Sequence, residues 1–130
     1  MRYFFWVKKR RKVRRTKKSL NHKKYIEDKE SARVFVKSRL ENWNLHYKFQ
    51  YGRVSIRNQR SRWGSCSKKG NLNFNFRIFT LPQHLADYII VHELCHIGEF
   101  NHSKKFWNLV CKTIPNYLEM RKELRKIRIN

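Results

Sequence analysis

The chain has 130 residues, of which 32 are Lys or Arg and 9 are Asp or Glu, giving a formal net charge of +23. This length suits one domain and excludes two independent hydrophobic cores, and a hydrophobic content of 40% supports a globular body. The charge favours polyanionic partners such as nucleic acid, anionic membrane or phosphorylated small molecules, but charge alone does not select among them.

The basic residues are densest at the N-terminus, where residues 1–24 contain 12 Lys or Arg and no acid. The run KKRRKVRRTKK at 8–18 is poor in apolar residues and repels itself. We therefore predict a flexible basic arm over residues 1–24 and one domain over residues 25–130, with no transmembrane segment. The arm is a candidate contact for DNA or RNA. Its candidate nucleic-acid-binding residues are Lys8, Lys9, Arg10, Arg11, Lys12, Arg14, Arg15, Lys17 and Lys18.

The first regular elements follow the arm. Apolar residues at three- and four-residue spacing predict a helix from about residue 25 to residue 43. Alternation of apolar and polar residues predicts strands at 54–56 and 72–76, the second continuing toward Ile78. Residues 60–70 between the strands are rich in Gly and Ser, which predicts a loop.

Residues typical of helix ends divide the rest of the chain into three predicted helices. Pro82 suits the first turn of a helix that Gly98 ends. Ser103 is a candidate N-cap for the next helix, and Pro115 separates it from a last helix over 117–127. The predicted fold class is α+β, a short antiparallel or mixed sheet packed by about four helices.

The most informative motif is HELCHIGEFNH at residues 92–102. His92 and His96 are four residues apart, so both imidazoles project from one helix face and can bind one metal ion. His102 follows beyond the helix end. Three imidazoles with one open position are typical of catalytic Zn²⁺ sites, whereas structural sites close with a fourth ligand. Glu93 is positioned to act as the general base on a water.

This motif predicts a zinc-dependent hydrolase, and it leaves the substrate open. A metallopeptidase that cleaves a polypeptide is the first hypothesis. A nucleotide pyrophosphatase that hydrolyses phosphoanhydrides is an alternative, because the positive charge attracts a phosphorylated small molecule. A nucleic-acid-binding module with a structural metal is a third hypothesis, although metal binding alone does not need Glu93.

Candidate substrate contacts come from the middle of the chain. The strand at 72–76 is expected to offer an edge for an extended peptide, and Asn73 lies on it. Trp63 beside Arg62 can stack on a nucleobase, but packing over the core to hold its loop is the favoured interpretation. The candidate substrate-binding residues are Arg62, Trp63, Asn73 and Tyr88. The residue types able to stabilise an oxyanion are His84, Tyr88, Arg62 and Tyr117.

The three cysteines form no CxxC pair and are odd in number, which predicts no disulfide framework. A reducing, cytoplasmic location is therefore expected.

The motifs of the chain also carry a family resemblance. They are, in order, RWGSCS at 62–67, Asp87-Tyr88, HELCH at 92–96, Asn101-His102-Ser103, Phe106-Trp107, Pro115 and Tyr117. In this order they resemble the YgjP-like metallopeptidase family. The resemblance implies a zincin-like fold with zinc on the three histidines and Glu93 as general base. It also implies kinship with SprT-like proteases, which act near DNA.

Overall fold

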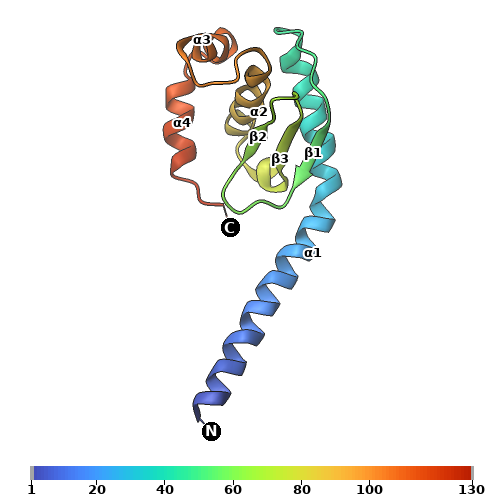
Figure 1. Cartoon of the computed structure of the whole chain (residues 1–130), viewed down its shortest axis with the longest axis vertical. Helices are drawn as coiled ribbons and strands as arrows, with labels where there is room; N and C mark the ends of the chain where they lie inside the picture. Colours follow the sequence, from blue (N-terminus) through green and yellow to red (C-terminus); the bar gives the residue numbers. More distant parts are fainter. Residues whose placement is uncertain (1, 130) are drawn as a thin grey trace.

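The computed structural model describes residues 2–129, and the side chains of residues 18–129, as an α+β fold in which helices pack against a small sheet (Figure 1). The elements are α1 (Arg2–Asn44), β1 (Val54–Arg57), β2 (Gly64–Cys66), β3 (Leu72–Asn75), the 3₁₀-helix η1 (Phe76–Thr80), α2 (Gln83–Gly98), α3 (Lys104–Thr113) and α4 (Tyr117–Arg125). The predicted fold class is confirmed.

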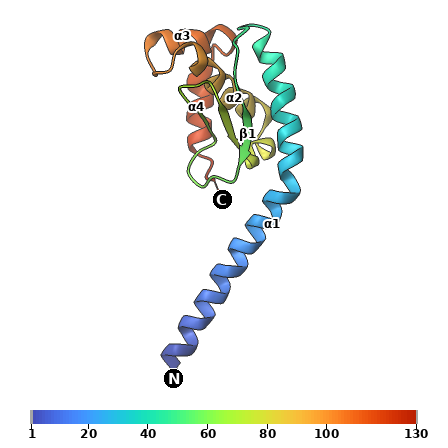
Figure 2. The ribbon, with the colours of Figure 1, turned by 45° about the vertical axis from the view of Figure 1, so that its right-hand side comes forward.

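Helix α1 is longer than predicted. It runs for 43 residues, about 65 Å at 1.5 Å per residue, and its first half extends away from the other elements (Figures 1 and 2). The predicted helix start near residue 25 is therefore wrong. The physical reason is propensity: Lys and Arg are good helix formers, and no Gly or Pro lies between Arg2 and Asn44. That residues 1–24 serve as a basic arm stays a prediction.

The second half of α1 packs on the domain. Ala32, Val36 and Leu40 recur every four residues on one face and are fully buried. Tyr25 donates a hydrogen bond to the Ile56 carbonyl at 3.2 Å. These contacts hold α1 against the sheet from about residue 25 onward.

The sheet has the order β1-β3-β2, with β1 parallel and β2 antiparallel to β3. The central strand is therefore β3, so the prediction that it offers a free edge to a peptide is wrong. The edge next to the later helices is β2, which lies inside the segment 60–70 predicted as a loop. Gly64 and Cys66 pair with Phe74 and Leu72, so β2 gains its strand conformation from a hydrophobic neighbour.

The chain leaves β3 earlier than predicted. After Asn75 it turns into η1, so the strand does not continue to Ile78. Buried Asn75 causes this turn: its side-chain oxygen accepts from the Arg77 amide at 3.1 Å. Its amide nitrogen donates to the carbonyls of Gln59 at 2.7 Å and Arg62 at 3.0 Å, which fixes the entry to β2.

Helix α2 is the centre of the domain and contacts α1, β2, α3 and α4. Arg39 of α1 binds Asp87 of α2 in a two-pronged ion pair, with N···O distances of 2.7 and 2.8 Å. The predicted helix after Pro82 and the Ser103 N-cap are both confirmed; the Ser103 hydroxyl accepts from the Phe106 amide at 3.4 Å. Over residues 2–129, no helix has the length and apolar character needed to cross a bilayer.

Candidate metal centre

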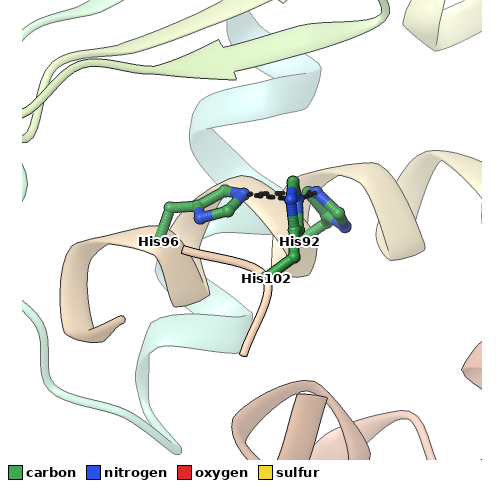
Figure 3. A group of neighbouring side chains, drawn as sticks. All are labelled: His92, His96 and His102. Atoms are coloured by element: carbon green, nitrogen blue, oxygen red, sulfur yellow. Dashed lines mark hydrogen bonds between the residues drawn. The ribbon is translucent and has the colours of Figure 1, made fainter. Parts of the chain in front are cut away.

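Three histidine side chains converge beside the outward face of α2 (Figure 3). His92 and His96 come from consecutive turns of α2, and His102 comes from the loop that leads into α3. The Nε2 atom of His102 lies 3.1 Å from that of His92 and 3.1 Å from that of His96, while the latter two are 3.3 Å apart. We call these three residues the histidine cluster.

This geometry fits a metal ion better than hydrogen bonds. An imidazole Nε2 carries either a proton or a lone pair, so three such atoms cannot all be paired with one another as donor and acceptor. Metal–nitrogen bonds of about 2.0–2.1 Å in a tetrahedral arrangement hold their nitrogens roughly 3.3 Å apart. The observed spacing is close to that value, so the donor set fits a single divalent ion such as Zn²⁺.

The Nδ1 atoms of His92 and His96 each lie near a polar partner on the side away from the cluster. His96 Nδ1 lies 3.2 Å from the Glu99 carbonyl, which can only accept, so Nδ1 carries the proton and the Nε2 lone pair faces the cluster. His92 Nδ1 lies 3.3 Å from the hydroxyl of the buried Tyr88. Partners of this kind fix the orientation of metal-binding imidazoles and raise their basicity.

The aromatic ring of Phe106 packs against the histidine cluster. Phe106 of α3 is fully buried and stacks on His96, with ring centroids 4.3 Å apart and planes at 19°. Its ring also meets those of His92 and His102 edge-on, each at 5.0 Å. One side chain therefore contacts all three imidazoles and limits their rotation.

A second stack continues from the cluster to α4. Trp107 lies parallel to His102 with ring centroids 5.9 Å apart and to Tyr117 with centroids 4.9 Å apart. The guanidinium of Arg121 lies over Trp107 at 4.7 Å from the ring centroid. The Phe106-Trp107 and Tyr117 motifs thus connect the loop histidine to α4.

Burial shapes the protonation of the site. It lowers the pKa of His92 to about 3, with His96 and His102 adding repulsion, and it also lowers the pKa of His96. Both imidazoles are neutral at physiological pH, which is the form that binds metals. Burial raises the pKa of Glu93 to about 8, opposed in part by the charge of Arg62. Positive charge brought into the cavity favours the ionised carboxylate.

Gly64 allows β2 to approach Glu93. A Cβ atom at this position would lie 3.0 Å from Glu93 Cγ, 3.2 Å from the Asn73 carbonyl oxygen and 3.3 Å from Phe74 Cδ1. Two of these neighbours are a strand backbone and a packed core ring, which have little room to move. The glycine of the RWGSCS motif is therefore required by the close contact of the edge strand with α2.

Two neighbouring cavities share His92 and Glu93. The histidine cavity, about 450 Å³, contains the histidine cluster, Glu93 and part of β2. The arginine cavity, about 650 Å³, extends from Glu93 toward α4. Its arginines are Arg60, Arg62, Arg121, Arg125 and Arg128.

The structure brings three of the four predicted substrate-binding residues to these cavities. Arg62 lines both, while Trp63 and Tyr88 line the arginine cavity. Trp63 also packs against the core, as the favoured interpretation predicted. Asn73 is not brought to the site: side chains alternate along β3, and Asn73 points to the opposite sheet face from Phe74 and the Gly64–Glu93 contact.

Among the four candidate oxyanion stabilisers, Arg62 is the best placed. His84 pairs with Glu123 at 2.7 Å between α2 and α4, and Tyr117 is engaged with Trp107. Tyr88 contacts His92 from behind. Neither His84 nor Tyr117 lines the two cavities.

Sequence reasoning missed two parts of the site. The sequence pattern assigned no role to Arg121 and Arg125 of the last helix, but both line the arginine cavity. Phe106 entered the sequence analysis only as part of the family resemblance and was given no role at the site. Its position three residues after the Ser103 N-cap places it on the buried face of α3. The only available signal for both was their spacing on helices next to the histidine motif.

An α+β fold whose central helix carries converging histidines beside a buried glutamate is typical of metal-dependent hydrolases. The sequence model of the YgjP-like metallopeptidase domain matches residues 6–127. The chain therefore belongs to the YgjP-like metallopeptidase family. Membership implies a divalent metal cofactor, for which the histidine cluster is the matching donor set. A comparison with curated proteins finds no significant match.

Solved structures of metallopeptidases are similar to the chain. The zymogen of abylysin from Pyrococcus abyssi has 26% sequence identity and a TM-score of 0.64, covering 70% of this chain and 92% of that one. The zymogen of jannalysin from Methanocaldococcus jannaschii has 22% identity and a TM-score of 0.61, covering 70% and 94%. A Wss1 mutant from Saccharomyces cerevisiae has 17% identity and a TM-score of 0.58, covering 75% and 83%. The last two similarities concern the fold alone.

Proposed function

We propose that this protein is a zinc metallopeptidase that hydrolyses peptide bonds, with the histidine cluster as the zinc ligands and Glu93 as the general base. The observation that carries the proposal is the convergence of three Nε2 atoms within 3.3 Å of one another in a cavity that also contains Glu93. Three protein ligands leave a coordination position for water or substrate. Family membership favours a polypeptide as the substrate.

The chemistry divides between the metal and the chain. Bound zinc supplies Lewis acidity, which polarises a carbonyl and lowers the pKa of water. Glu93 accepts a proton from the attacking water and returns it to the leaving amine. Its burial keeps competing water away from the carboxylate. Arg62, which borders both cavities, is the candidate for stabilising the developing oxyanion.

The edge strand β2 is a candidate pairing site for an extended polypeptide substrate. This strand forms one edge of the sheet and contributes Gly64, Ser65 and Cys66 to the wall of the histidine cavity. An extended polypeptide that pairs with an exposed strand edge is held by main-chain hydrogen bonds, which are independent of its side chains. Such pairing would carry successive peptide groups past the histidine cluster.

Phosphoanhydride hydrolysis is the second candidate function. It is favoured by the arginine cavity, because guanidinium groups also bind phosphate in a bidentate manner. We place it second because the family to which the chain belongs is a peptidase family.

The test incubates the zinc-loaded protein separately with an unfolded polypeptide, a nucleoside triphosphate and DNA, each with and without a chelator. Glu93→Gln is the matched variant, because it keeps the shape of the side chain and removes its basicity. We expect cleavage of the polypeptide that is lost with chelator and reduced by about 100-fold or more in Glu93→Gln, which still binds zinc. Hydrolysis of the triphosphate without peptide cleavage, or full activity of Glu93→Gln, would overturn the proposal.

A further inference from the structure

The arginine cavity concentrates positive charge without neutralising it. Among the residues the structure describes, no carboxylate lies within ion-pairing distance of Arg60, Arg62, Arg121 or Arg125. The acidic group on the cavity wall is Glu93, which is buried and serves the metal centre. Unpaired guanidinium groups that converge on one cavity provide a binding site for an anion.

The helix geometry of α4 and a stacking contact also orient two of these guanidinium groups. Arg121 and Arg125 are four residues apart on α4, so they occupy the same helix face. The stacking of Arg121 on Trp107 holds its head group over the aromatic row that leads to His102. Arginine presents a planar fork of donors that matches a carboxylate, which makes such a pair more specific than an ammonium group would be.

The position and size of the cavity select the ligand. It shares His92 and Glu93 with the histidine cavity, so a chain that passes the cluster continues into it. Its volume of about 650 Å³ suits a short peptide segment and is too small to enclose a nucleic acid duplex. Apolar walls from Trp63, Ile89 and Leu124 suit the aliphatic stem of a glutamate side chain.

Resting on the proposed peptidase function, we propose that the arginine cavity is a specificity subsite for a peptide carboxylate on one side of the scissile bond. The carboxylate is that of an Asp or Glu side chain or of a free C-terminus. The enzyme therefore prefers acidic substrate segments on the side of the cleavage site that lies toward α4.

The test uses one peptide sequence with Glu, Gln or Lys at single positions on either side of the cleaved bond. Each peptide is made with a free and an amidated C-terminus, which separates the two sources of the carboxylate. We expect kcat/KM for Glu over Gln to differ by about tenfold or more on one side only, because charged hydrogen bonds to guanidinium groups are strong. Equal values on both sides would overturn the subsite.

The chain offers a matched control on the same helix. Arg121→Gln with Arg125→Gln removes two charges from the cavity, whereas Lys122→Gln with Lys126→Gln removes two charges from outside it. The first pair should abolish the preference for Glu, and the second should leave it unchanged. Arg125→Gln alone, which keeps the stack on Trp107, should weaken the preference and guards against misfolding of the double variant. Loss of preference in both pairs would reduce the effect to net charge and overturn the proposal.

A binding measurement separates this proposal from the proposed function. In the Glu93→Gln background, fluorescence anisotropy of labelled Glu and Gln peptides reports on the cavity without hydrolysis. Tighter binding of the Glu peptide supports the subsite even if no peptide is cleaved, in which case the peptidase proposal alone fails. Stronger displacement of the labelled peptide by a nucleoside triphosphate than by unlabelled Glu peptide would assign the cavity to phosphate and overturn the proposal.

Discussion

The histidine cavity and the arginine cavity meet at Glu93, but they are built in opposite ways. The imidazoles of the histidine cavity pack on Phe106, and Tyr88 and the Glu99 carbonyl contact the Nδ1 atoms of His92 and His96. The arginine cavity is formed by long side chains of α4 and of the segment that leads into β2, and most of these side chains are exposed. A packed wall fixes the positions of atoms, whereas a wall of solvated arginines fixes only a charge. Changes in the first should therefore affect chemistry, and changes in the second should affect selectivity.

The largest expected effect is that of His102→Ala. Two remaining imidazoles leave a divalent ion half solvated, so zinc affinity should fall by more than about 100-fold and hydrolysis should be lost. His84→Ala is the matched control, because it also removes an imidazole but lies outside both cavities. Metal stoichiometry measured beside turnover tests this, and an unchanged zinc content in His102→Ala would exclude it as a ligand.

Phe106→Ala should weaken the histidine cluster by removing the ring that packs against it. Removing a fully buried ring costs about 3–5 kcal/mol of unfolding free energy, and it frees the three imidazoles to rotate. Zinc affinity should therefore fall in addition to stability. Val110→Ala, at a buried position on the same helix that does not line the histidine cavity, should lose stability but keep zinc affinity. Urea denaturation and zinc competition measure the two quantities, and full affinity in Phe106→Ala would contradict its positioning role.

Gly64→Ala tests the boundary between the two cavities. The added methyl group meets Glu93 and the backbone of β3, so the carboxylate should shift while the metal ligands stay in place. We expect zinc content to be kept and kcat to fall by about tenfold, since catalysis is sensitive to small displacements of the general base. Gly52→Ala, at a glycine outside both cavities, should leave kcat unchanged. A Gly64→Ala enzyme with full kcat would show that this contact does not position Glu93.

The smallest effect on the site is expected from deleting residues 1–18. This deletion removes 10 of the 32 Lys and Arg residues and no proposed ligand. Hydrolysis of a short neutral peptide should stay within about twofold, while the salt dependence of DNA or RNA binding should flatten, because its slope scales with the phosphate contacts made. Salt titrations of both proteins test this, and an identical slope would exclude the arm as the main polyanion contact.

Local patterns predicted the histidine cluster because its three residues are close in the sequence. The four-residue spacing of His92 and His96 translates directly into one helix face, and the loop after Gly98 brings His102 within reach. The strand β2 was missed because Gly64 and Ser65 have low strand propensity, and only pairing with β3 makes them a strand. Nothing in a helical pattern tells whether a charged face meets solvent or a cavity, so the pattern assigned no role to Arg121 and Arg125.

The same difference between local and distant partners bears on the order in which the site assembles. All three proposed metal ligands lie within residues 92–102, so closing the loop between them costs little chain entropy. A chain in which only α2 and the start of α3 have formed already presents the complete donor set. The environment of Glu93, by contrast, needs β2 and α4, which come from both sides of that segment. Metal capture can thus precede the folding of the catalytic pocket, and a partly unfolded molecule is expected to keep its ion after it has lost its activity.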